Sequence, residues 1–173
     1  MPRYDQHLHS RHSMDSKTEP AENVRRAIEV GLAGLTFTEH FDTDPRDWPD
    51  CVYDEGAYDA TIRTLRREFG ADIAIGKGIE ICYQPQNLDW IAEVVKRGRF
   101  DMVLLSVHYY PTGALHLRSS YEPRTLETAT RDYLDYVAGA VEWVARLQRR
   151  RGQKLFHVLG HLDLVKRYTQ RMF

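Results

Sequence analysis

The chain has 173 residues, enough for one domain with a sizeable apolar core. Its formal net charge of −1 gives no basic excess of the kind that nucleic-acid or anionic-membrane partners require. The sequence has no apolar run near the roughly 20 residues of a membrane span, no signal-peptide core at its start, and two cysteines without ligand or disulfide spacing. These features predict a cytoplasmic protein that binds neither nucleic acid nor membrane.

The N-terminal third predicts a strand, a helix and a second strand. Residues 4–9 favour a short strand that enters the histidine-rich turn "HSRHSMD". A helix is expected within residues 18–34, because Thr18 can cap it, Pro20 suits its first turn and apolar side chains recur at helical spacing. The segment "GLTFTEH", residues 34–40, follows as a strand.

The middle of the chain continues this alternation. A polar loop rich in Asp and Pro is expected over residues 41–56, followed by a helix over 56–69. Residues 72–81, "DIAIGKGIEI", predict a strand whose glycines permit a close backbone approach. A short helix is expected over 87–98. The nearly continuous apolar run over 100–110 predicts a strand that is buried on both faces.

The C-terminal third completes five strands that alternate with helices. A loop is expected over residues 109–121, a long helix from about 123 to 150, and a fifth strand over 154–161. A further segment opens at "LDLVKRY", residues 162–168. This alternation predicts an α/β fold of βα units around a parallel sheet, which is either flat or closed into a barrel.

Each predicted strand ends in a residue type that binds metal ions. The residues are His7 and His9, then His40, Glu80, His108 and His161. The carboxyl ends of parallel strands gather at one face, where α/β proteins build their active sites. Alternate residues of a strand point the same way, so His7 and His9 can face one ion. A single histidine at the end of a strand is usually an ordinary polar residue. Six potential ligands at the ends of five strands, however, predict a metal site.

The ligand types indicate which chemistry such a site would support. Imidazole and carboxylate groups suit Zn, Mn or Fe, and their number exceeds what one ion needs, so two or three ions are expected. Such clusters activate water and stabilise displacement at phosphorus. Hydrolysis of a phosphate ester is therefore the first interpretation, and amide or ring hydrolysis is the second.

Five stretches resemble the PHP domain (polymerase and histidinol phosphatase) family, most closely its histidinol-phosphatase branch. They are "DQHLHSRHSMDS", "GLAGLTFTEHFD", "GKGIEICY", "FDMVLLSVHYY" and "LGHLDLVKRY". The resemblance implies a distorted TIM-like (β/α)7 barrel, of which this chain would hold about five βα units. Residues 1–173 are expected to form a single PHP domain that is truncated at its C-terminal end, because no histidine or aspartate follows Asp163 to supply the family's last Asp-x-His-type motif.

The resemblance also implies residue roles. The metal ligands would be His7, His9, Asp15, His40, Glu80, His108 and His161, serving up to three ions. Glu80 would bridge two ions. Asp15, Glu80 and His108 are the candidate catalytic residues. For the phosphate group, the donor fork of Arg167 is the first candidate and that of Arg118 the second. The implied reaction converts L-histidinol phosphate and water to L-histidinol and phosphate, a step of histidine biosynthesis.

Three alternatives stay open on the sequence. The chain could be another PHP-type phosphoesterase, or an amidohydrolase-like metal hydrolase, although that class usually has a modified lysine at the position of Glu80. It could also be an inactive, truncated domain that retains one metal ion. The expected partner is a small-molecule phosphate ester, and self-association is the device expected to cover the open edge of the barrel.

Overall fold

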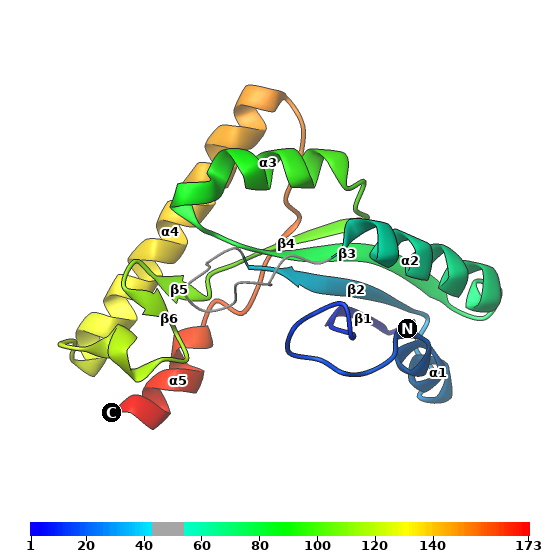
Figure 1. Ribbon diagram of the computed structural model, residues 1–173, viewed down its shortest axis with the longest axis horizontal. Helices are drawn as coiled ribbons and strands as arrows, with labels where there is room; N and C mark the ends of the chain where they lie inside the picture. The colour runs from blue at the N-terminus through cyan, green and yellow to red at the C-terminus, as the bar shows by residue number, and fades with distance from the viewer. Residues whose placement is uncertain (43–53) are drawn as a thin grey trace.

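The computed structural model describes residues 1–42 and 54–173, so most of the predicted loop over 41–56 lies outside the described residues (Figure 1). Five strands form one parallel sheet in the order β1-β2-β3-β4-β7. They are β1 (Tyr4–Leu8), β2 (Gly34–Phe41), β3 (Ala74–Cys82), β4 (Met102–Ser106) and β7 (Val158–Leu159). A separate antiparallel pair consists of β5 (Tyr109–Tyr110) and β6 (Gly113–Ala114).

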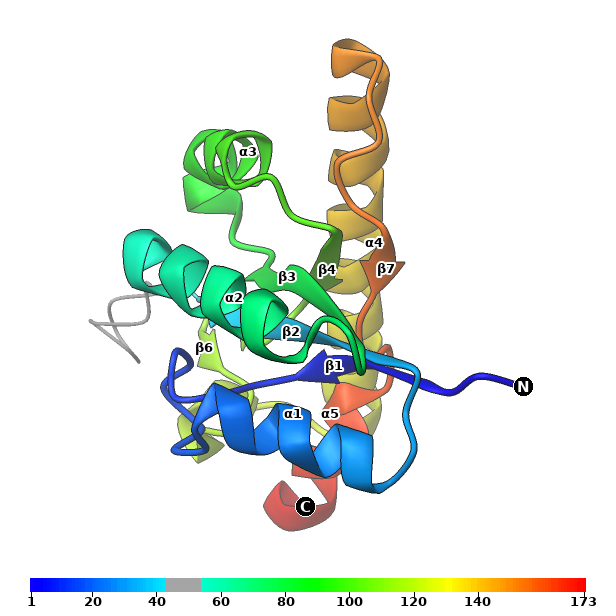
Figure 2. The ribbon, with the colours of Figure 1, turned by 90° about the vertical axis from the view of Figure 1, so that its right-hand side faces the viewer.

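The helices are α1 (Pro20–Glu29), α2 (Glu55–Phe69), α3 (Leu88–Arg97), α4 (Leu126–Arg151) and α5 (Leu164–Met172), with short 3-10 turns η1 (Pro85–Asn87) and η2 (Arg118–Tyr121). Four of these helices lie between the strands along the chain, and the fifth, α5, follows the last strand and contributes to the lining of a cavity. Figures 1 and 2 show that the sheet curls into part of a barrel. Of the two predicted arrangements, the sheet is therefore not flat, and it forms an incomplete barrel. Within residues 1–42 and 54–173, none of the helices combines the length and apolarity needed to cross a bilayer.

The two faces of the curled sheet carry different side chains. On β3 and β4, Ile79, Ile81, Val103 and Leu105 belong to the main hydrophobic core that includes the helices. Glu80 alternates with these residues and therefore points to the concave face. Because β2 and β3 are parallel and their register is regular, their concave-face residues lie side by side, as the pairing of His40 with Glu80 illustrates.

An irregularity in β1 determines where its histidines point. Tyr4 pairs with Gly34, whereas Leu8 pairs with Phe37, so the register shifts within this short strand. Leu8 consequently shares the orientation of Phe37 and packs against the main core. His7 and His9, on either side of Leu8, face the concave side, because register irregularities re-aim the side chains that follow them.

The glycines of β3 have the predicted role. A Cβ atom at Gly78 would lie 2.6 Å from the carbonyl oxygen of Phe37 on the adjacent strand, which is too close for any other residue without a backbone shift. A glycine at this position lets β3 approach β2 closely just before Glu80.

Several element boundaries differ from those predicted. The apolar run over 100–110 is two strands: β4 ends at Ser106, and β5 leaves the sheet to pair with β6, where the backbone N–H of Leu115 donates to the carbonyl of His108. The fifth strand, β7, is reduced to two residues. The predicted cap at Thr18 is wrong, because the N-cap residue of α1 is Glu19, directly before Pro20.

Candidate metal centre

Glu80 lies at the centre of five imidazoles. Its side chain is fully buried, and its Oε2 lies 3.2 Å from Nε2 of His7, 3.4 Å from Nε2 of His9 and 3.3 Å from Nδ1 of His40.

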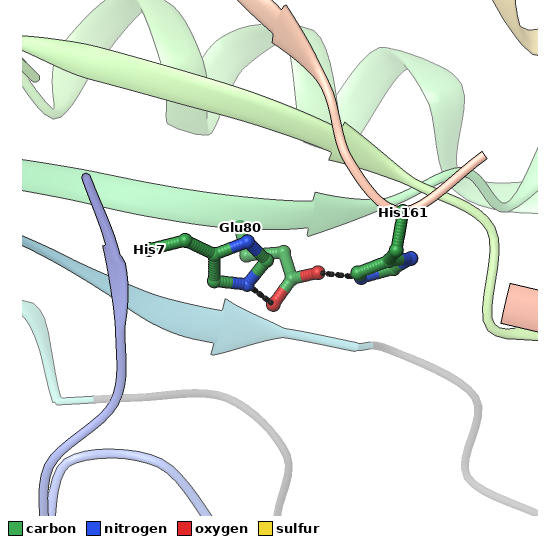
Figure 3. A group of neighbouring side chains, drawn as sticks. All are labelled: His7, Glu80 and His161. Carbon is green, nitrogen blue, oxygen red and sulfur yellow. Dashed lines mark hydrogen bonds and ion pairs between the residues drawn. The ribbon is translucent and has the colours of Figure 1, made fainter. Parts of the chain in front are cut away.

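The other oxygen of Glu80 faces a second group of side chains. Its Oε1 lies 2.7 Å from Nε2 of His161 and 3.2 Å from Nε2 of His108, and it accepts a hydrogen bond of 2.5 Å from the Ser106 hydroxyl. Figure 3 shows His7 and His161 approaching the carboxylate from opposite sides, one at each oxygen. This arrangement suits a carboxylate that bridges two cations.

Two further carboxylates extend the cluster away from Glu80. Oδ2 of Asp15 lies 3.4 Å from Nε2 of His40. Oδ2 of Asp42 lies 2.7 Å from Nδ1 of His108, and the side chain of Asp42 is almost completely buried. Asp15, in contrast, is half exposed, so it lies where the cluster meets solvent.

The cluster forms the floor of a cavity of about 450 Å³. Its floor and walls consist of His7, His9, Met14, Asp15, His40, Asp42, Glu80, His108, Tyr109, Leu115, His116, His161, Leu164, Arg167 and Tyr168. The cavity has room for a small molecule, and its lining also includes a guanidinium, Arg167, and the aromatic rings of Tyr109 and Tyr168.

The turn that carries Asp15 is held by a buried carboxylate, Glu39. This residue accepts hydrogen bonds from the backbone N–H of Ser10 (3.0 Å) and from the hydroxyls of Ser10 (2.6 Å) and Ser13 (2.5 Å). The Ser13 hydroxyl in turn accepts from the backbone N–H of His40 (2.9 Å). Glu39 thus ties the histidine-rich turn to the end of β2 and brings Asp15 to His40.

The donor set fits divalent metal ions. Among the described residues, three groups each offer ligand atoms within 4.8 Å of one another: His7, Glu80 and His161; His9, His40 and Glu80; and His40, Asp42 and His108. These nitrogen and oxygen donors suit Zn, Mn or Fe, and Glu80 belongs to two groups. Nδ1 of His40 is buried without a hydrogen-bond partner within the part of the chain described here, as expected where a cation completes the site.

The electrostatics of the cluster favour the ligand forms at Glu80 and His9. Burial opposes ionisation of Glu80, but the contacts of its oxygens with the imidazoles of His108, His161 and His7 outweigh burial and hold the pKa of this carboxyl well below its usual value. Burial, reinforced by the neighbouring His40, lowers the pKa of His9, so this imidazole is neutral at pH 7. A carboxylate and neutral imidazoles are the forms that bind metal ions.

The structure brings all seven predicted ligands to this cavity, while their role as ligands stays a prediction. Of the two arginines, Arg167 lines the cavity. Arg118 is absent from its lining, and its guanidinium donates instead to the carbonyls of Arg171 and Met172 on α5.

Sequence reasoning missed Asp42. This residue follows His40 at the alternate position, so the segment "HFD" repeats the logic that identified His7 and His9. Asp42 was overlooked because it falls in a stretch whose Asp, Pro and Gly content indicates a loop.

We expect Zn²⁺ to stabilise the metal-free protein. A ligand that binds only the folded state at about 100 times its dissociation constant adds about 2.7 kcal/mol to the free energy of unfolding. The gain should be smaller at pH 5 than at pH 7.5, because protonated imidazoles do not bind metal ions. Thermal unfolding with Zn²⁺ and with a chelator measures this effect, and equal Tm values in the two conditions at pH 7.5 would contradict it.

The curled parallel sheet and the carboxylate-centred imidazole cluster at its strand ends together define an α/β half-barrel protein with side-chain groups that could hold metal ions. The chain belongs to the PHP domain family, whose model matches residues 5–172.

Curated relatives support this assignment. The chain is 31% identical over 172 residues to a probable histidinol-phosphatase of Deinococcus radiodurans and 31% identical over 175 residues to a histidinol-phosphatase of Lactococcus lactis. These matches cover 95% and 97% of this chain but 62% and 59% of the relatives. The chain thus spans about three fifths of the length of these relatives.

Solved structures share the fold. A histidinol phosphate phosphatase from Lactococcus lactis, crystallised with Zn, L-histidinol and phosphate, has a TM-score of 0.81 and 29% sequence identity over 96% of this chain and 60% of its own. A protein from Listeria monocytogenes, described as a putative histidinol phosphatase, has a TM-score of 0.81 at 18% identity, over 98% of this chain and 70% of its own, and supports the fold alone.

Proposed function

We propose that this chain is a metal-dependent phosphomonoesterase that converts L-histidinol phosphate and water to L-histidinol and phosphate, a step of histidine biosynthesis. The observation that carries the proposal is Glu80, whose two oxygens each face a separate group of imidazoles. The names of the relatives, and the L-histidinol and phosphate bound by the Lactococcus lactis protein, support the choice of substrate. A cytoplasmic location belongs to the same proposal, because Cys82 is a free thiol.

The proposed ligands are the seven residues predicted from the sequence, serving up to three ions of Zn, Mn or Fe. When bound, these ions supply Lewis acidity toward the phosphoryl oxygens and activate water for in-line attack. Glu80 would hold two ions at a fixed separation. His108 and His161 would complete one of these sites, and His7 and His9 another, with Asp15 and His40 at the third.

The remaining cavity residues would bind and orient the phosphate ester. Arg167 projects from α5 into the lining and is the proposed phosphate-binding residue, since its guanidinium can donate two parallel hydrogen bonds. Tyr109, His116 and Tyr168 would form the wall for the rest of the substrate. Asp15, Glu80 and His108 stay the proposed catalytic residues.

The alternatives differ in what they predict for this cavity. An amidohydrolase-like site usually has a modified lysine near the ions, but the lining contains no lysine among the described residues. Lys77, on the same strand as Glu80, points away and pairs with Asp59 and with the carbonyl of Gly98. This geometry favours phosphate-ester hydrolysis over amide hydrolysis.

Phosphate release from L-histidinol phosphate by protein loaded with Zn, Mn or Fe tests the proposal. Turnover above that of the metal-free protein is expected. Turnover only of other phosphomonoesters would instead indicate another PHP-type phosphoesterase. One bound ion without turnover would indicate a metal-binding domain, and either result would overturn the proposed function.

Replacing Arg167 with alanine is expected to raise KM for L-histidinol phosphate by about 10- to 100-fold, because a hydrogen bond to a charged group contributes roughly 1.5–3 kcal/mol. Steady-state kinetics on the metal-loaded protein measures the change. The exposed Arg63 on α2, outside the cavity lining, is the matched control and should keep its KM when replaced with alanine. An unchanged KM in R167A would remove Arg167 from the phosphate site.

We further propose that a second copy of the chain covers the open side of the half-barrel. Tyr4 on β1 and Val158 and Leu159 on β7 are exposed apolar side chains that line a second cavity of about 510 Å³, which His7 and His161 also line. Within the described residues, the outer edges of β1 and β7 pair with no other strand, and uncovered edges of this kind favour association. Light scattering across a dilution series should detect a dimer, and a monomer at every concentration would contradict this.

A further inference from the structure

His108 lies between two carboxylates, one on each side of its ring. Its Nε2 lies 3.2 Å from Oε1 of Glu80, and its Nδ1 lies 2.7 Å from Oδ2 of Asp42. Glu80 belongs to the proposed ligand set. Asp42 is not among the seven proposed ligands, although its side chain is only 6% exposed and lines the cavity.

The sheet, rather than the surface of a loop, brings Asp42 and His108 together. Asp42 directly follows β2 at Phe41, and His108 comes two residues after β4 ends. Strand β3 lies between them, and its last residue, Cys82, accepts a hydrogen bond through Sγ from the backbone N–H of His108 (3.4 Å). The carboxylate therefore meets the imidazole at a place determined by three adjacent parallel strands.

The distance between Nδ1 and Oδ2 is that of a direct hydrogen bond. At 2.7 Å, Oδ2 of Asp42 accepts a hydrogen bond from Nδ1 of His108, while Nε2 of the same ring faces Glu80. A neutral imidazole with hydrogen on Nδ1 has its lone pair on Nε2, which is the nitrogen that faces Glu80.

We propose that Asp42 is the positioning residue of His108: it holds the proton on Nδ1 and the ring in place, so that Nε2 is presented to the ion beside Glu80. The inference rests on the metal centre of the proposed function. Carboxylates that hydrogen-bond a ligating histidine orient the ring and increase its basicity, and their loss typically costs 10- to 100-fold in metal affinity.

The tautomer of His108 gives a direct test without metal or turnover. In ¹⁵N spectra of the metal-free protein at a pH where the ring is neutral, His108 is expected to carry its proton on Nδ1. In the D42A variant a mixture of tautomers is expected. A dominant Nε2–H form in the unaltered protein would overturn the proposal, and this measurement requires no variant to fold.

Zinc affinity, measured by competition with a chromophoric chelator, gives the second readout. D42A should bind with the same stoichiometry but about 10- to 100-fold more weakly, and D42N should lose less because its amide oxygen can still accept from Nδ1. D135A, at an exposed position on α4, is the matched control and should bind like the unaltered protein.

Two results would overturn the role of Asp42. An unchanged zinc affinity in D42A would show that His108 needs no positioning carboxylate. A stoichiometry lower by one ion, with the other ions bound as tightly as before, would make Asp42 a direct ligand. The tautomer and the zinc affinity are measured without turnover. Both measurements would therefore still test the role of Asp42 if the proposed phosphatase reaction failed.

Discussion

The E80Q variant is expected to lose metal ions from the site and to hydrolyse the phosphate ester about 10²- to 10³-fold more slowly, the range measured when a preorganised electrostatic group is removed from an active site. Glutamine has nearly the same shape but carries no charge, and only one of its two terminal atoms can bind a cation. Glu80 presents both oxygens to imidazoles and is fully buried, so no solvent can replace the missing oxygen.

Metal content by mass spectrometry and phosphate release under substrate saturation would measure these two effects. Glu142, exposed on α4 and absent from the cavity lining, is the matched control, and E142Q should retain both metal content and activity. Full metal content in E80Q would refute the bridging role of Glu80, whichever substrate the protein hydrolyses.

The F37A variant is expected to lower the free energy of unfolding by about 3–5 kcal/mol, the usual cost of removing a buried phenyl group. Phe37, on β2, is completely buried in the main core. For a chain of this length the loss corresponds to a Tm lower by about 6–20 °C. Chemical denaturation followed by circular dichroism measures the change.

The same variant separates stability from metal binding. Phe37 belongs to the main core and is absent from the lining of the metal cavity, so folded F37A should bind the same number of ions as the unaltered protein. Leu126 is half-exposed at the start of α4, and the free energy of unfolding of L126A should stay within about 0.5 kcal/mol of that of the unaltered protein. Equal destabilisation by both variants would show that Phe37 is not part of a close-packed core.

Much of the fold was predictable because its signals are local. The apolar runs of β3 and β4 and the helical spacing of α1 to α4 report which face of each segment is buried, and that pattern depends only on neighbouring residues. The strand-end positions of His40, Glu80 and His161 followed from the same pattern.

The hydrophobic pattern of the sequence was less informative about element boundaries that depend on pairing between distant strands. The end of β4 at Ser106 depends on where β3 stops and on the pairing of β5 with β6, so an uninterrupted apolar run could not reveal it. The length of β7 likewise depends on its two register pairs with β4.

The sequence by itself determined that five βα units would place imidazoles and carboxylates at the carboxyl ends of the parallel strands. The order of the segments and the alternation of side chains along each strand are enough for that conclusion. Only the tertiary structure decided that Glu80 stands at the centre, that Arg167 rather than Arg118 reaches the cavity, and that Asp42 meets His108 across 66 residues of chain. The physical reason is that side-chain partners are selected by the register and curl of the sheet, and neither is encoded in the periodicity of any single segment.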